Sequence, residues 1–360
     1  MRARMPWVGG DSGRVGMGRL EGVEGADREC GPPTLVRVRE LRVPGLRRAC
    51  GSRLVARLEE RLAARPELVV VPGWRFGMPA RRDFLMPLRE LLARLHRVAQ
   101  CPGAVTVPWF GGLRLRVSPG TDIGRCVYAM GCFEPNELAY LSTALRPGQV
   151  FVDVGANEGL FSLLAASLVG RGGAVLAVEP SSRERLRLEE NLRMNGMDWV
   201  RVRPEAVAES AGRLELAIAD PLHPGQSTLG SPIWPRTTVT GKELVDVTTL
   251  DRLVDEEGLD RIDLVKLDVE GAELRVLRGS ATVLRRYRPP LLLELQDESL
   301  RRQGGSAREL LDELEHLDYQ VLEFSEASGL PCRVAGEAPS SLNVLAVPTE
   351  RAESVLGGAG

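Results

Sequence analysis

The chain has 360 residues, of which 43% are hydrophobic and 27% charged, as expected of a globular protein with one large domain and an appendage. Its 47 basic and 49 acidic residues leave a net charge of −2, so no basic excess favours nucleic acid as a partner. The six cysteines form no Cys-x-x-Cys pair and there are three histidines, which excludes a zinc site of usual spacing. Without a secretory segment or a long apolar run, we expect a cytoplasmic protein with reduced thiols and no membrane span.

The first hundred residues differ in composition from the rest. Residues 1–50 are rich in Gly, Arg and Pro, so we expect them to be disordered or to include an over-long start. Residues 51–110 are expected to form a helical extension, because apolar residues recur at helical spacing over 53–65 and 82–100. In the second run we expect His96 at the surface and one apolar stripe packed on the main domain, made of Phe84, Leu85, Leu88, Leu91, Leu92 and Leu95.

From residue 111 to 350 the pattern predicts one α/β domain, followed by a tail at 351–360. An alternating strand is predicted over 113–117. Helices are then predicted over 137–145, 159–168, 183–194, 248–257, 273–285 and 306–317, and strands over 150–154, 174–179, 200–202, 262–268, 291–295, 320–324 and 343–347. The stretch between 203 and 247 is predicted to be irregular. Strands alternating with helices through short loops indicate parallel βαβ units in a doubly wound sheet.

A glycine-containing loop follows the first buried strand of this domain. The segment FVDVGANEGLFSL (151–163) runs from that strand through Gly155 and Gly159 into a helix. Glycines let the backbone turn sharply and approach a ligand, and the first N–H groups of a helix are free to bind it. The next strand ends at Glu179, where a carboxylate can accept hydrogen bonds from ribose hydroxyls. These features fit two ligand classes, NAD-like dinucleotides and S-adenosylmethionine.

Two residues of the loop favour S-adenosylmethionine. A dinucleotide fingerprint needs a second glycine, G-x-G-x-x-G, where this chain has Asn157. Asp153 lies two residues before Gly155, where a carboxylate would repel a pyrophosphate and attract the ammonium group of a methionine moiety. We therefore predict S-adenosyl-L-methionine as the cofactor, and a nicotinamide-dependent oxidoreductase is the alternative enzyme.

These segments resemble the FkbM family of class I S-adenosylmethionine-dependent methyltransferases. The resemblance extends over about residues 110–350 and rests on GCFEPNELAYL (131–141), the glycine-loop segment, AVEPSSRERLRLEENLRMNG (177–196), EAVAESAGRLEL (205–216), VTTLDRLVDEEGLDRIDLVKLDVEGAELRVLRG (247–279), RPPLLLELQ (288–296) and NVLAV (343–347). It implies a Rossmann-like fold with a seven-stranded, mostly parallel sheet whose last strand is antiparallel. It also implies methyl transfer to a hydroxyl of a sugar, polyketide or other secondary metabolite.

The resemblance also implies roles for residues of the glycine loop and of the two strands that follow it. Asp153, Gly155, Asn157 and Gly159 would hold the methionine side of the cofactor. Glu179 would bind the ribose, and Glu205 and Ala206 would flank the adenine. A protein that binds the cofactor without catalysis, as a partner in a biosynthetic assembly, remains a further alternative.

The motif VKLDVEGAE (265–273) contains a second group of charged residues. Lys266 and Asp268 are two apart on a strand and share a face, although buried parallel strands are usually apolar throughout. Either they form an ion pair that fixes the turn, or Asp268 and Glu270 line the cleft and one of them orients or deprotonates the acceptor hydroxyl. Glu294, which ends the next strand, could face the same cleft. Carboxylates at 153, 268 and 270 could hold Mg²⁺, but without a nearby histidine we expect no metal.

Residues 220–242 carry four prolines, so neither a helix nor a central strand should run through them. They include Trp234, whose flat face suits a sugar or an apolar chain, and His223, which could act as a base. We interpret the segment as a lid on the acceptor side. A proline-stiffened surface loop is the alternative. The acceptor's identity and the oligomeric state are not determined by these patterns.

Overall fold

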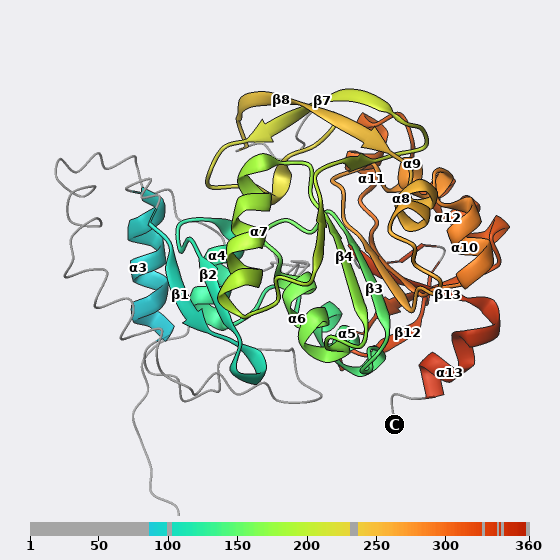
Figure 1. Ribbon diagram of the computed structural model, residues 1–360, viewed down its shortest axis with the longest axis horizontal. Helices are drawn as coiled ribbons and strands as arrows, with labels where there is room; N and C mark the ends of the chain where they lie inside the picture. The colour runs from blue at the N-terminus through green and yellow to red at the C-terminus, as the bar shows by residue number, and fades with distance from the viewer. Residues whose placement is uncertain are drawn as a thin grey trace, which may run out of the picture. The chain divides into compact units, whose positions relative to one another are not determined.

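The computed structural model describes residues 86–98, 103–230, 237–325, 328–336, 338–339 and 342–357 (Figure 1). These residues belong to one compact unit, Arg42–Gly360. The predictions for residues 1–50 and for the helix at 53–65 lie outside the described residues, as does Trp234. Within the described ranges, no helix combines the length and apolar character needed to cross a membrane.

A mixed sheet of eight strands forms the centre of the domain. Its order is β12-β11-β13-β10-β9-β3-β4-β5. Five neighbouring strands are parallel, whereas β13 is antiparallel to both of its neighbours, β10 and β11. This confirms the predicted α/β fold with an antiparallel last strand. The eighth strand is β12, a short edge strand that pairs with the end of β11. The bounds are β3 (Val150–Val154), β4 (Ala174–Val178), β5 (Arg201–Arg203), β9 (Leu264–Leu267), β10 (Leu291–Glu294), β11 (Tyr319–Phe324), β12 (Pro331–Arg333) and β13 (Asn343–Pro348).

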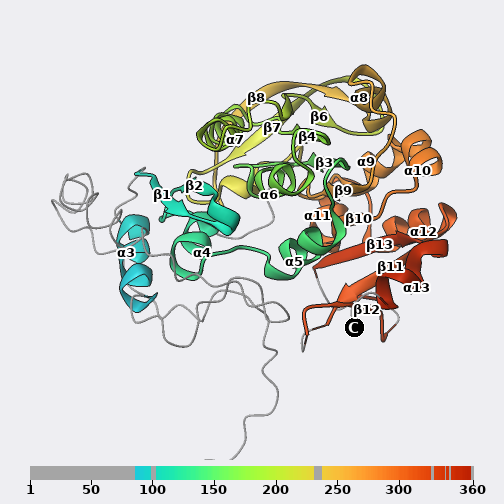
Figure 2. The same ribbon diagram turned by 60° about the horizontal axis from the view of Figure 1, so that its bottom comes forward.

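Helices cover both faces of the sheet, and each face has its own apolar core (Figure 2). One face packs against α5 (Pro135–Ala144), α6 (Leu160–Val169), α7 (Ser182–Met194) and α13 (Ala352–Gly357). The other packs against α8 (Leu250–Glu256), α9 (Glu273–Arg278), α10 (Ala281–Tyr287), α11 (Asp297–Arg302) and α12 (Ala307–His316). Because side chains alternate along a strand, each strand contributes to both cores. In β3, for example, Phe151 packs on the α5–α6 face, and Val152 and Val154 pack on the opposite face.

Several parts of the domain differ from the prediction, among them helices α4 (Asp122–Met130) and α11 (Asp297–Arg302), which were not predicted. The helix predicted over 273–285 is two helices, α9 and α10, separated at Gly279, where a Cβ atom would lie 2.1 Å from the carbonyl oxygen of Ala208. The stretch 203–247, predicted to be irregular, contains a second sheet of three strands, β6 (Ala206–Val207), β7 (Gly212–Ala219) and β8 (Val239–Thr248). Strands β7 and β8 pair across a long connection, so no local sequence pattern predicted them.

The described N-terminal part consists of α3 (Met86–Val98), the hairpin β1 (Val105–Pro108) and β2 (Arg114–Val117), and α4 (Asp122–Met130). Phe84 and Leu85 of the predicted stripe lie outside the described residues. The described part of α3 packs only partly as expected, since Leu92 is partly buried against the core but Leu88 and Leu91 are 39% and 53% exposed. Its buried side chains are instead Arg89, Ala93 and His96, so the surface position expected for the histidine is wrong. Charged contacts orient the helix, because Glu90 and Arg97 form ion pairs with residues of α4.

Candidate functional site

The polar residues singled out in the sequence gather at the carboxyl ends of the central strands, where open α/β sheets bind their ligands. Alternation along the strands explains why they share a face. Phe151, Leu264 and Leu292 point to the α5–α6 side. The side chains two positions later in each strand, Asp153, Lys266 and Glu294, therefore point to that side as well.

The glycine loop is held tightly by its neighbours. The N–H groups of Gly155 and Ala156 both donate to the carbonyl of Val178, at 2.9 and 3.0 Å. Gly155 has a φ of +84°, and a Cβ atom there would lie 1.8 Å from the carbonyl oxygen of Asp268. Gly159 has a φ of +89°, and its Cβ would lie 2.4 Å from Leu188. Only glycine fits these two positions without displacing backbone or core atoms.

Two acidic side chains flank this loop. Asp153 is 1% exposed and accepts a hydrogen bond of 2.6 Å from the Ser162 hydroxyl through Oδ2. Its other oxygen, Oδ1, is buried and has no hydrogen-bond partner among the described residues. Glu179 accepts hydrogen bonds of 2.8 Å from the N–H groups of Asn157 and Ser181. Burial raises the pKa of Glu179 to about 8, and it also raises the pKa of Asp153, although the nearby Lys266 ammonium opposes this.

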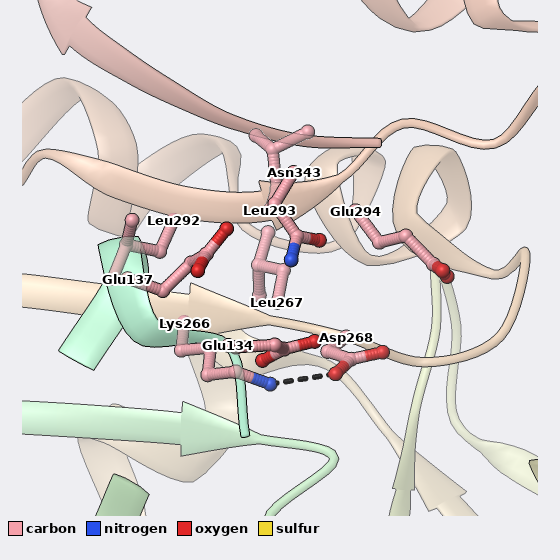
Figure 3. A pocket seen from close by; sticks show the side chains of 9 residues that line it. All are labelled: Glu134, Glu137, Lys266, Leu267, Asp268, Leu292, Leu293, Glu294 and Asn343. Atoms are coloured by element: carbon pink, nitrogen blue, oxygen red, sulfur yellow. Dashed lines mark hydrogen bonds and ion pairs between the residues drawn. The ribbon is translucent and has the colours of Figure 1, made fainter. Parts of the chain in front are cut away.

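A pocket beside the loop contains most of the second group of charged residues (Figure 3). The Lys266 ammonium donates to Asp268 Oδ2 at 2.7 Å and lies 4.7 Å from the centroid of the Phe161 ring. The remaining charged or polar side chains come from α5 and its N-cap and from the ends of β10 and β13. The pocket is lined by Glu134, Glu137, Lys266, Leu267, Asp268, Leu292, Leu293, Glu294 and Asn343.

The carboxyl groups here outnumber the one ammonium. Burial raises the pKa of Glu134 to about 8 and raises the pKa values of Glu270 and Glu294 well above their ordinary range. Burial opposes the charge of Lys266, but Asp268 and its acidic neighbours outweigh it and raise the pKa of the ammonium. Glu134 therefore carries a proton at neutral pH, whereas Asp268 is ion-paired with Lys266.

Three residues of the site have a left-handed backbone. Glu134, Asn157 and Glu270 have φ values of +50°, +50° and +52°, and they are three of the five non-glycine residues with positive φ in the described ranges. This conformation costs free energy, and such residues concentrate at functional sites. The strain singles out Glu134, which lies at the N-cap of α5. Glu137 and Asn343 were not predicted, because no local pattern connects them with the other residues.

Other predicted residues lie elsewhere. Glu205 forms a bidentate ion pair with Arg203, with contacts of 2.5 and 3.1 Å. It also lines a second pocket together with Pro180 and Arg185. Ala206 is 4% exposed, and its side chain packs in the small core of the β6–β8 sheet. Among the described residues, no three His, Cys, Asp or Glu side chains are grouped as metal ligands would be.

His223 is not among the residues that line the pocket of Figure 3. Its Nδ1 lies 2.5 Å from Asp122 Oδ2, and its Nε2 lies 3.3 Å from a guanidinium nitrogen of Arg97. A guanidinium only donates hydrogen bonds, so Nε2 must accept and Nδ1 must carry the proton. The lone pair that a general base needs is therefore occupied, and the predicted base role of His223 is not supported by these contacts.

The sheet order, the antiparallel last strand and the acidic residues at the ends of β3 and β4 define a Rossmann-like, class I methyltransferase fold. Residues 153–321 match the family described as Methyltransferase FkbM domain. This part of the chain is therefore an FkbM methyltransferase domain, as the motifs predicted. Helices α3 and α4 precede the matched region.

Three relatives give the range of similarity. Methyltransferase sdnD of Sordaria araneosa is 36% identical over 36% of this chain and 59% of its own length. The 31-O-demethyl-FK506 methyltransferase FkbM of Streptomyces tacrolimicus is 33% identical over 38% and 60%. The 2-O-methyltransferase NoeI of Sinorhizobium fredii is 27% identical over 46% and 71%. The chain thus spans about three fifths of the length of sdnD and of the Streptomyces tacrolimicus enzyme.

Proposed function

We propose that this chain transfers a methyl group from S-adenosylmethionine to a hydroxyl oxygen of a small molecule or glycan. The observation that carries the proposal is the buried, unpartnered Oδ1 of Asp153 beside the glycine loop. A buried polar atom without a partner costs free energy, and the ammonium group of the cofactor would satisfy it. An O-linked acceptor is supported by two relatives, whose names denote a 2-O-methyltransferase and a 31-O-demethyl-FK506 methyltransferase.

The cofactor would be held by the glycine loop and by the two acidic residues that flank it. Asp153 would bind the ammonium group, Gly155 and Gly159 would let the backbone approach the methionine moiety, and Asn157 would close the loop. Glu179, already bound to two loop N–H groups, would accept from the ribose hydroxyls with its remaining lone pairs. Glu205 lines the second pocket, which follows β5 and would suit the adenine.

The cofactor supplies an activated methyl group on a sulfonium, so catalysis needs mainly alignment and removal of one proton. Asp268 is our choice for the base, because it lines the pocket of Figure 3 and the Lys266 ammonium orients it through a hydrogen bond of 2.7 Å to Oδ2. The bound cofactor would donate its methyl group to the acceptor oxygen and leave as the neutral thioether, and Asp268 would accept the proton that the hydroxyl loses. Glu270 and Glu294, with raised pKa values, would hold the acceptor as protonated donors.

Binding calorimetry and turnover on a panel of sugars and polyketide alcohols test this proposal. We expect S-adenosylmethionine to bind with a Kd near 1 μM, about −8 kcal/mol, and NAD to give no heat. Asp268→Asn and Glu270→Gln should each lower kcat by about 100-fold or more while the fold survives, and Glu298→Gln on exposed α11 is the matched control.

Each alternative predicts a different result. Binding of NAD without S-adenosylmethionine would favour an oxidoreductase. Tight cofactor binding without turnover on any acceptor would favour a non-catalytic partner. If Asp268→Asn lowers the melting temperature and leaves the kcat of the folded fraction unchanged, the ion pair only fixes the turn.

A further inference from the structure

Residues 97, 122 and 223 form a polar triad that joins three separate segments. Arg97 lies in the last turn of α3, Asp122 begins α4, and His223 precedes the short 3-10 helix Pro224–Gln226. The Arg97 guanidinium donates to Asp122 Oδ1 at 2.6 Å and contacts His223 Nε2 at 3.3 Å, and His223 Nδ1 lies 2.5 Å from Asp122 Oδ2. Each member thus binds the other two. The His223 side chain is 10% exposed, whereas the Arg97 and Asp122 side chains are 28% and 42% exposed, so the imidazole is the buried member of the triad.

The triad fixes one end of residues 220–230. The backbone supports the same contact, because the N–H of Asp122 donates to the carbonyl of Leu222 at 3.2 Å. Helices α3 and α4 are also joined independently of the triad, by the ion pair between Glu90 and Arg125 at 2.5 Å. The two helices therefore offer a preassembled support to which the segment is attached.

The same segment touches both proposed site loops. A Cβ atom on Gly225 would lie 3.1 Å from the side-chain nitrogen of Asn157, so the backbone of the segment packs directly on the glycine loop. Further along, the Thr228 hydroxyl donates to the carbonyl of Glu270 at 3.0 Å and accepts from Gln303 at 2.8 Å. Asn157 and Glu270 are two of the residues held in the left-handed conformation, which persists only where neighbours enforce it.

We propose that Arg97, Asp122 and His223 are positioning residues that clamp residues 220–230 onto the two site loops. By this contact helices α3 and α4, which precede the FkbM domain, complete the cofactor site. The inference rests on the proposed function, since it takes the glycine loop as the cofactor cradle. The role of His223 is then to hold its segment, through Asn157 and Glu270, and not to accept the proton of the hydroxyl.

Hydrogen exchange and ligand dissociation of the full chain test the clamp, with S-adenosylhomocysteine as the probe. We expect His223→Ala to raise the exchange rate of amides in 220–230 and to speed dissociation of S-adenosylhomocysteine about 10-fold, with a smaller change in kcat. His223→Asn should restore most of the effect, because its amide N–H replaces the donor to Asp122. His223→Gln should restore less, because it keeps only the weaker contact with Arg97.

The control is Glu90→Gln, which breaks the other ion pair between α3 and α4 without touching the triad. It should leave exchange of 220–230 at the wild-type rate. If Glu90→Gln raises exchange in 220–230 as much as His223→Ala does, any loosening of α3 and α4 has this effect, and the specific positioning role of the triad is wrong. The clamp is also overturned if exchange is unchanged in His223→Ala, or if exchange rises but dissociation does not.

Asp122→Asn serves as a second variant if His223→Ala does not fold, with the same expected result. Failure of the proposed function would look different. In that case the wild-type protein itself would not bind S-adenosylhomocysteine, and the claim that the clamp completes a cofactor site would fall with it.

Discussion

The proposed cofactor side and the proposed acceptor side of the site are built in different ways. On the cofactor side, the contacts that shape the loop connect Asp153 with Ser162 and Glu179 with Asn157 and Ser181, all within one βαβ unit. On the acceptor side, the pocket takes its polar residues from the N-cap of α5, β9, β10 and β13. The first is a local structure that recurs with its motif, whereas the second depends on remote segments meeting.

Their electrostatics differ as well. Asp153 and Glu179 each accept hydrogen bonds from neighbouring O–H or N–H groups. On the acceptor side, Asp268 and Glu134 instead act on the Lys266 ammonium, and Glu294 lines the same pocket. Charged groups that share one counterion shift one another's pKa values, so the acceptor side should be the more sensitive of the two to changes in a single charge.

The largest effect is expected on the cofactor side, from Gly155→Ala. The new Cβ would meet the Asp268 carbonyl at 1.8 Å in a backbone with positive φ, so we expect a loss of several kcal/mol in the free energy of unfolding and no cofactor binding. Gly170→Ala is the control, because its φ of +64° brings strain but its Cβ would meet nothing within 4 Å. Chemical denaturation measures both. Equal losses would mean that close packing at Gly155 is unimportant.

On the acceptor side, Lys266→Met should have the next largest effect. Its side chain is 8% exposed, and its removal leaves Asp268 and Asp153 without their common cation. Breaking a buried ion pair from one side costs about 3–5 kcal/mol in unfolding free energy. The double variant Lys266→Met, Asp268→Asn should recover part of the loss. If it is as unstable as the single variant, packing of the lysine stem matters and its charge does not.

A pH series separates the two sides further. Burial raises the pKa of Glu179 from 4.5 to about 8, so this carboxyl is protonated in the folded protein where it would be ionised in the unfolded chain. Its contribution to stability is complete below pH 4.5 and is lost as pH rises through about 8. A ribose binds the ionised form, so cofactor affinity should rise with pH up to about 8, by at most about 10-fold per unit.

Calorimetry of wild type and Glu179→Gln between pH 6 and 9 checks this, and the amide variant should show a flatter dependence because it does not titrate. An identical rise in both proteins would assign the pH dependence to the acceptor-side carboxyl groups instead, of which Glu134 has its pKa near 8.

The smallest effect is expected from a chelator. The described carboxyl groups are not arranged as metal ligands, and Asp268 already binds Lys266. Excess EDTA should therefore leave the turnover rate of the protein unchanged. A loss of activity that Mg²⁺ restores would show that Asp153, Asp268 and Glu270 rearrange around a metal.

Local patterns by themselves determined much of this protein. Apolar runs and helical spacing marked most of the central strands and helices, because burial on both faces leaves a continuous apolar strand and one-sided burial leaves a helical stripe. The motif around Gly155 predicted the glycine loop and its turn into α6, because the contacts of this loop lie within a short stretch of chain. The residues Asp153, Glu179 and Asp268 were singled out for the same reason.

Tertiary structure alone decided what depends on distant contacts. Pairing of β7 with β8, the break at Gly279 against Ala208, and the buried face of α3 each follow from a partner far away in the chain. The same holds for the meeting of Glu134, Glu137 and Asn343 in one pocket and for the attachment of His223 to Asp122. Charged side chains pair with groups that are close in space but distant in sequence. Their spacing along the chain therefore does not predict which partner they contact.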